Sequence, residues 1–201
     1  MPYVFQFFVQ HHLRFEESLQ GERCEAHNQS GDRCSRNTVI GRGLCWQHLL
    51  SKKHLRIKQS TIPGAGKGLF ALDKSKPLGA VLFHAGVKIL QYDGTVMTRQ
   101  ALDNKYGHED FVTAPYAIEI PHGRVEDAAM RRSPAAIINH KPHNQANCKL
   151  MIQRGGLHAH LRNRAAVVTI DTIRNGDELF ADYSDGYIMH DDRTSYRTIY
   201  K

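Results

Sequence analysis

Three short motifs restrict the fold of this chain more than its composition does. Asn139-His140 is followed eight residues later by Asn147-Cys148. A closing segment, Gly176-Asp177-Glu178-Leu179, then runs into Asp182-Tyr183, and two glycines flank Lys67 far upstream. Each motif alone is common in proteins, so the information lies in their joint presence and in their order.

The length and composition predict one main globular domain. The chain has 201 residues, of which 41% are hydrophobic, which is enough to build a core. Its mean hydropathy is −0.49, and no apolar run approaches the ~18 residues that a bilayer span requires. The apolar segment 1–9 lacks a basic start and a small-residue cleavage site, so we expect no secretory signal, no membrane partner and an intracellular protein.

The charge is strongly positive and unevenly distributed. The formal net charge is +7 and the isoelectric point is about 9.3, which favours acidic partners such as nucleic acid or chromatin. Eight basic and three acidic residues lie within 22–58. This stretch is a candidate DNA contact, and a solvated basic face is an equally good interpretation.

Three of the four cysteines lie close together in the sequence and predict a zinc site. Cys24, Cys34, Cys45 and His48 have the spacing Cys-x9-Cys-x10-Cys-x2-His, and supply three thiolates and one imidazole. That donor set matches a closed tetrahedral structural zinc site. His27 is an alternative ligand, because Cys24 and His27 repeat the Cys-x2-His spacing. Free cysteines, or one disulfide with a thiol left over, are the competing interpretations.

The pattern after residue 54 predicts a β-rich α+β domain with few helices. Short apolar runs separated by turn residues predict strands at 55–58, 69–72, 81–83, 87–90, 116–120, 149–152 and 165–170. Met97, Ala101, Leu102 and Tyr106 are spaced by about three and four, which predicts a helix over 95–110.

The glycine-rich segment 64–68 does not match a nucleotide-binding loop. A P-loop would need glycine at Thr61 and a hydroxyl side chain at Gly68. A dinucleotide-binding fingerprint would need glycine at Leu69. The segment is therefore a glycine turn, and only the motifs downstream indicate a function for it.

Over residues 54–187, these motifs in this order resemble the SET-domain protein lysine methyltransferases. The resemblance implies a fold of short strands with a C-terminal pseudoknot, preceded here by the small zinc module. It also implies S-adenosylmethionine as cofactor and methyl transfer to a lysine side chain, with a histone tail or nucleosome as partner. A nuclear location follows from that substrate class.

The resemblance also assigns roles to individual residues. The residues implied in cofactor binding are Gly66, Lys67, Gly68, Leu69, Asn139, His140 and Tyr183. Those implied in catalysis are Tyr183, whose hydroxyl would orient the amine and methyl group, Tyr116 at the lysine channel, and His84.

The chain also departs from the family pattern. The two motif asparagines are eight residues apart instead of six, and His84 replaces the tyrosine of a Tyr-x-Gly motif. Asp185 stands where many members carry an aromatic residue that sets how many methyl groups are added, and Tyr187 could substitute for it.

The expected domain organisation has four parts. They are an N-terminal arm (1–20), the zinc module (21–50), the SET methyltransferase domain (51–187) and a tail that closes the substrate channel (188–201). The alternative function is a non-catalytic chromatin or DNA adaptor that uses the zinc module and the basic surface on a degenerate SET scaffold.

Overall fold

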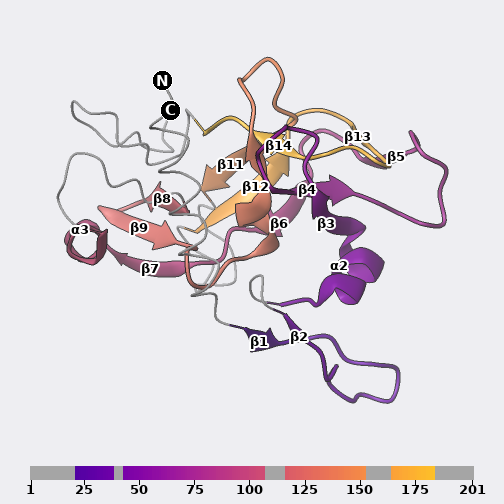
Figure 1. Ribbon diagram of the computed structural model, residues 1–201, viewed down its shortest axis with the longest axis horizontal. Coiled ribbons are helices and arrows are strands. Elements are labelled where there is room, and N and C mark those ends of the chain that lie inside the picture. Colours follow the sequence, from indigo (N-terminus) through magenta and orange to yellow (C-terminus); the bar gives the residue numbers. More distant parts are fainter. Residues whose placement is uncertain (1–20, 39–42, 107–115, 153–163, 184–201) are drawn as a thin grey trace.

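The computed structural model describes residues 21–38, 43–106, 116–152 and 164–183 (Figure 1). Within them, β-strands dominate, which confirms the predicted β-rich α+β class. The helices are α2 (Trp46–Lys53), α3 (Arg99–Tyr106) and the short 3-10 helix η1 (Pro134–Ile137). The strands are β1 (Glu22–Arg23), β2 (Asn37–Thr38), β3 (Leu55–Gln59), β4 (Lys67–Ala71), β5 (Val81–Phe83), β6 (Lys88–Gln91), β7 (Thr95–Thr98), β8 (Ala117–Ile120), β9 (Arg124–Asp127), β10 (Asn139–His140), β11 (Cys148–Ile152), β12 (Ala165–Thr169), β13 (Ile173–Arg174) and β14 (Phe180–Ala181). The two described α-helices have eight residues each, whereas a bilayer span takes about 20.

A five-stranded mixed sheet, in the order β10-β14-β11-β12-β6, forms the centre of the molecule. The last strand, β14, lies between β10 and β11 and runs parallel to both. The connection 141–147 joins β10 to β11 and therefore crosses β14. Lys141 N donates to Ala181 O (3.1 Å) and Asn147 N donates to Phe180 O (3.1 Å), which holds the crossing in place. This is the crossing expected of the predicted pseudoknot, a rare exception to unthreaded chains.

The β3–β4 hairpin carries the glycine pair and contacts the same closing segment. Leu179 N donates to Leu69 O (2.8 Å), and Ala71 N donates to Asp177 O (2.9 Å). Leu69 and Leu179 are fully buried in the main core. The glycine motif and the closing motif, far apart in sequence, are therefore adjacent in space.

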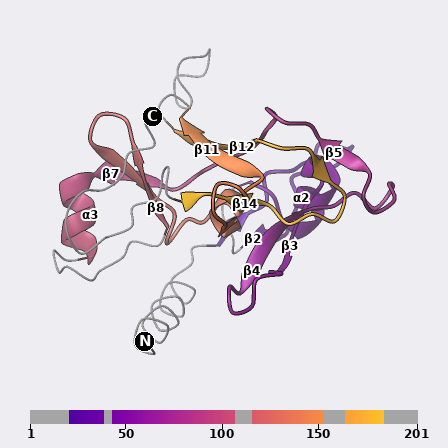
Figure 2. The ribbon, with the colours of Figure 1, turned by 90° about the horizontal axis from the view of Figure 1, so that it is seen from above.

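A second, three-stranded antiparallel sheet has the order β7-β9-β8. Both views place it, with α3, at the end of the molecule opposite α2, β3 and β4, with β14 between (Figures 1 and 2). The predicted helix over 95–110 is wrong at its start, because Thr95–Thr98 forms β7 and Met97 pairs with Val125 of β9. Strand pairing with β9 outweighs the helical spacing there.

The N-terminal described segment leads directly into the domain. Cys45 is the N-cap of α2, and His54, at φ 54°, ends it by donating its N–H to the carbonyls of Leu49 and Leu50. β3 starts at the next residue. The predicted boundary after residue 50 thus falls within α2, and the division into domains stays a prediction. The predicted arm 1–20 and tail 188–201 lie outside the described residues.

Candidate functional site

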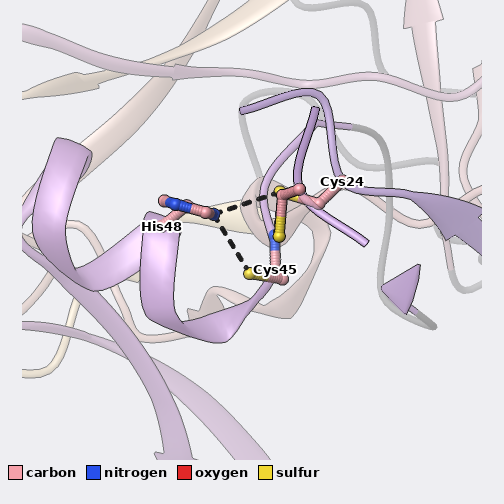
Figure 3. Close-up of side chains that lie close together, drawn as sticks. Cys24, Cys45 and His48 are labelled. Carbon is pink, nitrogen blue, oxygen red and sulfur yellow. Dashed lines mark hydrogen bonds between the residues drawn. The ribbon is translucent and has the colours of Figure 1, made fainter. Parts of the chain in front are cut away.

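Four side chains of the N-terminal segment converge on one point. The sulfur atoms of Cys24, Cys34 and Cys45 and a ring nitrogen of His48 all lie within 4.8 Å of one another. His48 Nδ1 is 3.4 Å from Cys24 Sγ and 3.3 Å from Cys45 Sγ (Figure 3). The predicted cluster of three cysteines and one histidine is confirmed. His27, the alternative ligand, is exposed and is not part of it.

Backbone geometry explains why distant cysteines meet. Cys24 N donates to Arg36 O (2.8 Å) and Cys34 N donates to Ala26 O (2.7 Å). Two arginines reinforce these turns: Arg23 Nε donates to Cys34 O (2.9 Å), and Arg33 Nε donates to Cys24 O (2.9 Å). The hydrogen bonds of the two guanidinium groups therefore stabilise a short polar segment that has little hydrophobic packing.

The cysteines of the cluster are free thiols in different electrostatic surroundings. A backbone hydrogen bond at Arg36 lowers the pKa of Cys34, whereas burial raises the pKa of Cys45. Three sulfurs and one imidazole suit a zinc ion, which prefers thiolate and imidazole ligands in tetrahedral sets of four. The fourth cysteine, Cys148, is fully buried in β11, and burial raises its pKa to about 12, so it is an unreactive core residue.

A second site surrounds Tyr183, which lies two residues after the end of β14. Its hydroxyl donates to the carbonyl of Ile138, and its ring lies 5.1 Å from the ring of His140. Burial, and then the nearby Tyr116, raise the pKa of the Tyr183 phenol. The phenol is therefore neutral at physiological pH, and its oxygen retains lone pairs for another donor.

A small apolar cavity adjoins the Tyr183 ring. Its lining residues are Tyr92, Ile118, Ala135, Ala136, Ile138, Leu150, Ala181 and Tyr183. Tyr116 lies just before β8, and its carbonyl accepts a hydrogen bond from the Tyr92 hydroxyl (2.8 Å). The guanidinium of Arg132, itself only 2% exposed, stacks 3.7 Å from the centre of the Tyr116 ring. The site thus combines apolar walls, tyrosine rings and one buried positive charge.

The two glycines beside Lys67 are glycines for different reasons. Gly66 has φ +71°, and a Cβ there would meet nothing within 4 Å. Gly68 is buried, and a Cβ there would lie 2.1 Å from Glu178 Oε1. Position 66 therefore leaves open space beside the backbone, whereas position 68 makes room for a carboxylate of the protein itself.

Glu178 is a further residue of this site, and in the sequence it stands out only as part of the closing motif. Its side chain accepts hydrogen bonds from Ser60 Oγ (2.7 Å), Thr61 N (2.7 Å), Thr61 Oγ1 (2.6 Å) and Asn139 Nδ2 (3.2 Å). Burial alone would raise its pKa, but the hydrogen bonds from Thr61, Ser60 and Asn139 outweigh burial and lower it. Its place directly before the apolar run Leu179-Phe180-Ala181 was the signal that could have identified it.

The asparagine motifs fix the closing segment. Asn139 Nδ2 also donates to Lys67 O (3.0 Å), and the Asn147 side chain donates to Glu178 O and accepts from Phe180 N, both at 2.8 Å. His140 Nδ1 accepts the backbone N–H of Tyr183 (3.0 Å). These amides and this imidazole set the position of β14 and of Tyr183 just after it.

The remaining predicted site residues are more scattered. Leu69 is a core residue, Lys67 is exposed, and both are in β4. His84 is exposed in the turn after β5, where its carbonyl accepts from Thr169 Oγ1 (2.7 Å), and none of its described contacts involves Tyr183 or Tyr116. Asp185 and Tyr187 lie outside the described residues. The structure therefore brings together Tyr183, Tyr116, Asn139, His140 and the glycine segment, but not His84.

Comparisons with known proteins agree with this geometry. The family profile described as the SET domain matches residues 35–184. A histone-lysine N-methyltransferase, H3 lysine-4 specific, of Cryptococcus neoformans is 25% identical over 162 residues, which are 79% of this chain and 10% of that protein. The chain thus spans about a tenth of the length of this relative.

Solved structures share the fold. One is ctPRC2 in an autoinhibited conformation bound to S-adenosylmethionine, with 22% identity and a TM-score of 0.53, covering 69% of this chain and 16% of that chain. Another is Chaetomium thermophilum Polycomb Repressive Complex 2 bound to an inhibitor, again with 22% identity and a TM-score of 0.53, covering 69% of this chain and 17% of that chain.

Proposed function

We propose that this chain, which belongs to the SET-domain family, is an S-adenosylmethionine-dependent protein lysine N-methyltransferase that acts on histones in the nucleus. The observation that carries the proposal is the neutral, partly buried phenol of Tyr183 beside an apolar cavity, in contact with Ile138 and His140. The histone-specific relative supports the substrate class, and the S-adenosylmethionine-bound structure supports the cofactor.

The glycine segment and the asparagine motif are the proposed cofactor-binding residues. S-Adenosylmethionine, when bound, supplies a methyl group carried on a positively charged sulfur. The open space beside Gly66 fits close approach of a ligand to the backbone, and the Asn139 amide is aligned by Lys67 O and Glu178. The other residues proposed to bind the cofactor are Lys67, Gly68, Leu69 and His140.

The cavity beside Tyr183 is the proposed entry point for the substrate amine. Lysine has a pKa near 10.4 in water, so its nitrogen must lose a proton before it can act as a nucleophile. Apolar walls disfavour the charged amine, and the buried guanidinium of Arg132 next to Tyr116 disfavours a second positive charge. Tyr183 and Tyr116 then align the neutral amine through their hydroxyls, and alignment alone accounts for much of the rate gain in such reactions.

The four-residue cluster is the proposed structural zinc site, with Cys24, Cys34, Cys45 and His48 as ligands. Because the donor set is complete with four protein ligands, the ion would stabilise the fold and not bind substrate. It would fix the N-terminus of α2, whose N-cap is Cys45.

The test of methyl transfer combines the full chain, labelled S-adenosylmethionine and core histones. We expect labelled histone, and a Tyr183→Phe variant should lose about 10²-fold or more of the rate. Tyr106→Phe is a matched control, because it removes a partly buried hydroxyl that bonds to Asp127 Oδ2 in the second sheet. Equal labelling by the wild type and by Tyr183→Phe would remove Tyr183 from its proposed role.

A non-catalytic chromatin adaptor is the second candidate, and the position of His84 favours it. One of three predicted catalytic side chains is exposed outside the tyrosine site. Thermal unfolding with and without S-adenosylmethionine separates the two candidates, because a ligand at 100 times its Kd stabilises the folded state by about 2.7 kcal/mol. An adaptor that has lost the cofactor site would show no shift in Tm.

A further inference from the structure

We infer that one face of α2 and β3 binds the phosphate backbone of duplex DNA. The surface consists of Trp46, Lys53, Arg56 and Lys58 and is called the α2–β3 stripe below. It lies outside the tyrosine site, so the inference goes beyond methyl transfer and does not depend on it. Figure 1 shows α2 directly followed by β3 at one side of the molecule.

The helical half of the stripe is set by spacing. Trp46 and Lys53 are seven residues apart in α2, so they lie on the same side of the helix, two turns from each other. Trp46 is 55% exposed, although a tryptophan of a small domain is usually well buried. Its exposure marks this side of α2 as a contact surface.

The strand half continues the same surface. Arg56 and Lys58 alternate in β3 with Leu55 and Ile57, which pack in the main core, so both basic side chains point to the other face. The Arg56 guanidinium lies 4.9 Å from the centre of the Trp46 ring, which joins strand and helix into one surface.

The charges of the stripe are not neutralised within the described part of the chain. Segment 46–58 contains no acidic residue, and none of the described ion pairs involves Lys53, Arg56 or Lys58. Lys53 and Lys58 are exposed, and Arg56 is partly exposed. A row of uncompensated positive charges beside an exposed indole complements a row of phosphates.

Two other basic residues of 22–58, Arg23 and Arg33, are engaged in contacts within the protein. Arg23 and Arg33 donate to backbone carbonyls within the cysteine-rich segment, including Arg23 Nη2 to Arg33 O (3.0 Å) and Arg33 Nη2 to Arg23 O (2.8 Å). These two guanidinium groups are structural. With Arg23 and Arg33 engaged in this way, we place the DNA contact at the C-terminal part of the stretch.

The stripe is held on a rigid support. Cys45, the N-cap residue of α2, and His48, in the first turn of the helix, both belong to the cysteine cluster. At the other end, β3 pairs with β4 over five residues each, from Leu55 opposite Ala71 to Gln59 opposite Lys67. Because the backbone of the stripe is already ordered, DNA binding would cost conformational entropy only in its side chains.

The chain contains a single tryptophan, Trp46, which makes the test specific to this surface. The full chain is titrated with a 20-base-pair duplex at several salt concentrations, without cofactor or histone, while duplex anisotropy and tryptophan emission are recorded. We expect both signals to change with the same midpoint. A triple variant, Lys53→Gln, Arg56→Gln and Lys58→Gln, should bind at least about tenfold more weakly, with a salt slope shallower by about 2.7.

Two further variants make the result decisive. Lys74→Gln, Lys76→Gln and Lys149→Gln together remove the same charge from exposed positions elsewhere and should leave the salt slope within one unit of the wild type. Lys53→Arg with Lys58→Arg should keep wild-type affinity. Four outcomes would each overturn the inference. Two concern the variants: equal weakening of binding by both triple variants, or unchanged affinity of the stripe variant. The other two concern the wild type: DNA binding without a change in Trp46 emission, or binding of polyglutamate in preference to DNA. Because the assay contains no cofactor, its failure leaves the proposed methyl transfer untouched.

Discussion

Glu178 occupies the space that a side chain at position 68 would need. A Cβ on Gly68 would lie 2.1 Å from Glu178 Oε1 and 3.3 Å from Asn139 Nδ2. The carboxylate in turn accepts hydrogen bonds from the chain that enters the glycine segment, at Ser60 and Thr61. The absence of one methyl group thus allows the start of the domain and its closing segment to meet.

Gly68→Ala is therefore expected to destabilise the protein more than Gly66→Ala does. The alanine methyl at 68 must displace Glu178 from its hydrogen bonds, which we expect to lower the free energy of unfolding by about 2–4 kcal/mol. At position 66 the only cost is an alanine at positive φ, roughly 1 kcal/mol. Urea unfolding of both variants measures the difference, and equal stability would show that Glu178 moves aside at little cost.

Glu178→Gln should change how stability depends on pH. The native pKa of Glu178 is lowered, so its stabilising contribution is complete above the unfolded pKa of about 4.3 and decreases as pH falls below it. Glutamine does not titrate, and its N–H₂ group would face two of the four groups that donate to the carboxylate. We expect the variant to be less stable at pH 7, with the gap to wild type narrowing on going from pH 6 to pH 3.5. A gap that stays constant over this range would contradict the lowered pKa.

The sequence predicted local structure better than it predicted contacts between distant segments. Alternating apolar residues around Leu55 and Ile118 and the apolar run 165–170 identify strands correctly, because burial on one or both faces leaves a local signature. The segment at Thr95 reads as helix, yet it pairs with β9, whose sequence is some 30 residues away. Such a pairing partner leaves no trace in the segment itself.

Contacts between distant segments also limit how much of the site the sequence predicts. The cysteine spacing and the asparagine motif locate ligands and polar clusters, because each is concentrated in a short stretch. The network of Glu178 joins Ser60, 118 positions earlier, with Asn139, and depends on the crossing of β14 through an earlier loop. Only three-dimensional placement could also separate Tyr183 and Tyr116 from the exposed His84.

Metal content should distinguish the two candidate histidines. We expect about one zinc per purified chain by mass spectrometry, retained in His27→Ala and reduced severalfold in His48→Ala and Cys45→Ser, because His48 and not His27 lies in the cluster. Since thiols must lose protons to bind zinc, the affinity should fall as pH is lowered. Loss of zinc from His27→Ala with retention in His48→Ala would reverse the ligand assignment.

Arg132 offers a test of how the proposed substrate amine becomes neutral. Its guanidinium is buried, stacks on Tyr116 and donates to Ala129 O (3.3 Å), while its Nε atom has no hydrogen-bond partner among the described residues. A buried cation repels a second positive charge, so it favours the deprotonated amine.

Arg132→Met keeps the length and most of the packing of the side chain but removes its charge. We expect the rising limb of kcat/KM against pH to move upward by roughly half a unit, since the amine then holds its proton more tightly. Arg132→Lys keeps the charge and should leave the limb in place. Methyl transfer to a histone peptide from pH 7 to 10 measures the shift. Because burial raises the pKa of the Tyr183 phenol, its ionisation should not contribute a falling limb in this range. Identical profiles for wild type and Arg132→Met would mean that Arg132 only supports the Tyr116 ring and has no part in the ionisation of the substrate.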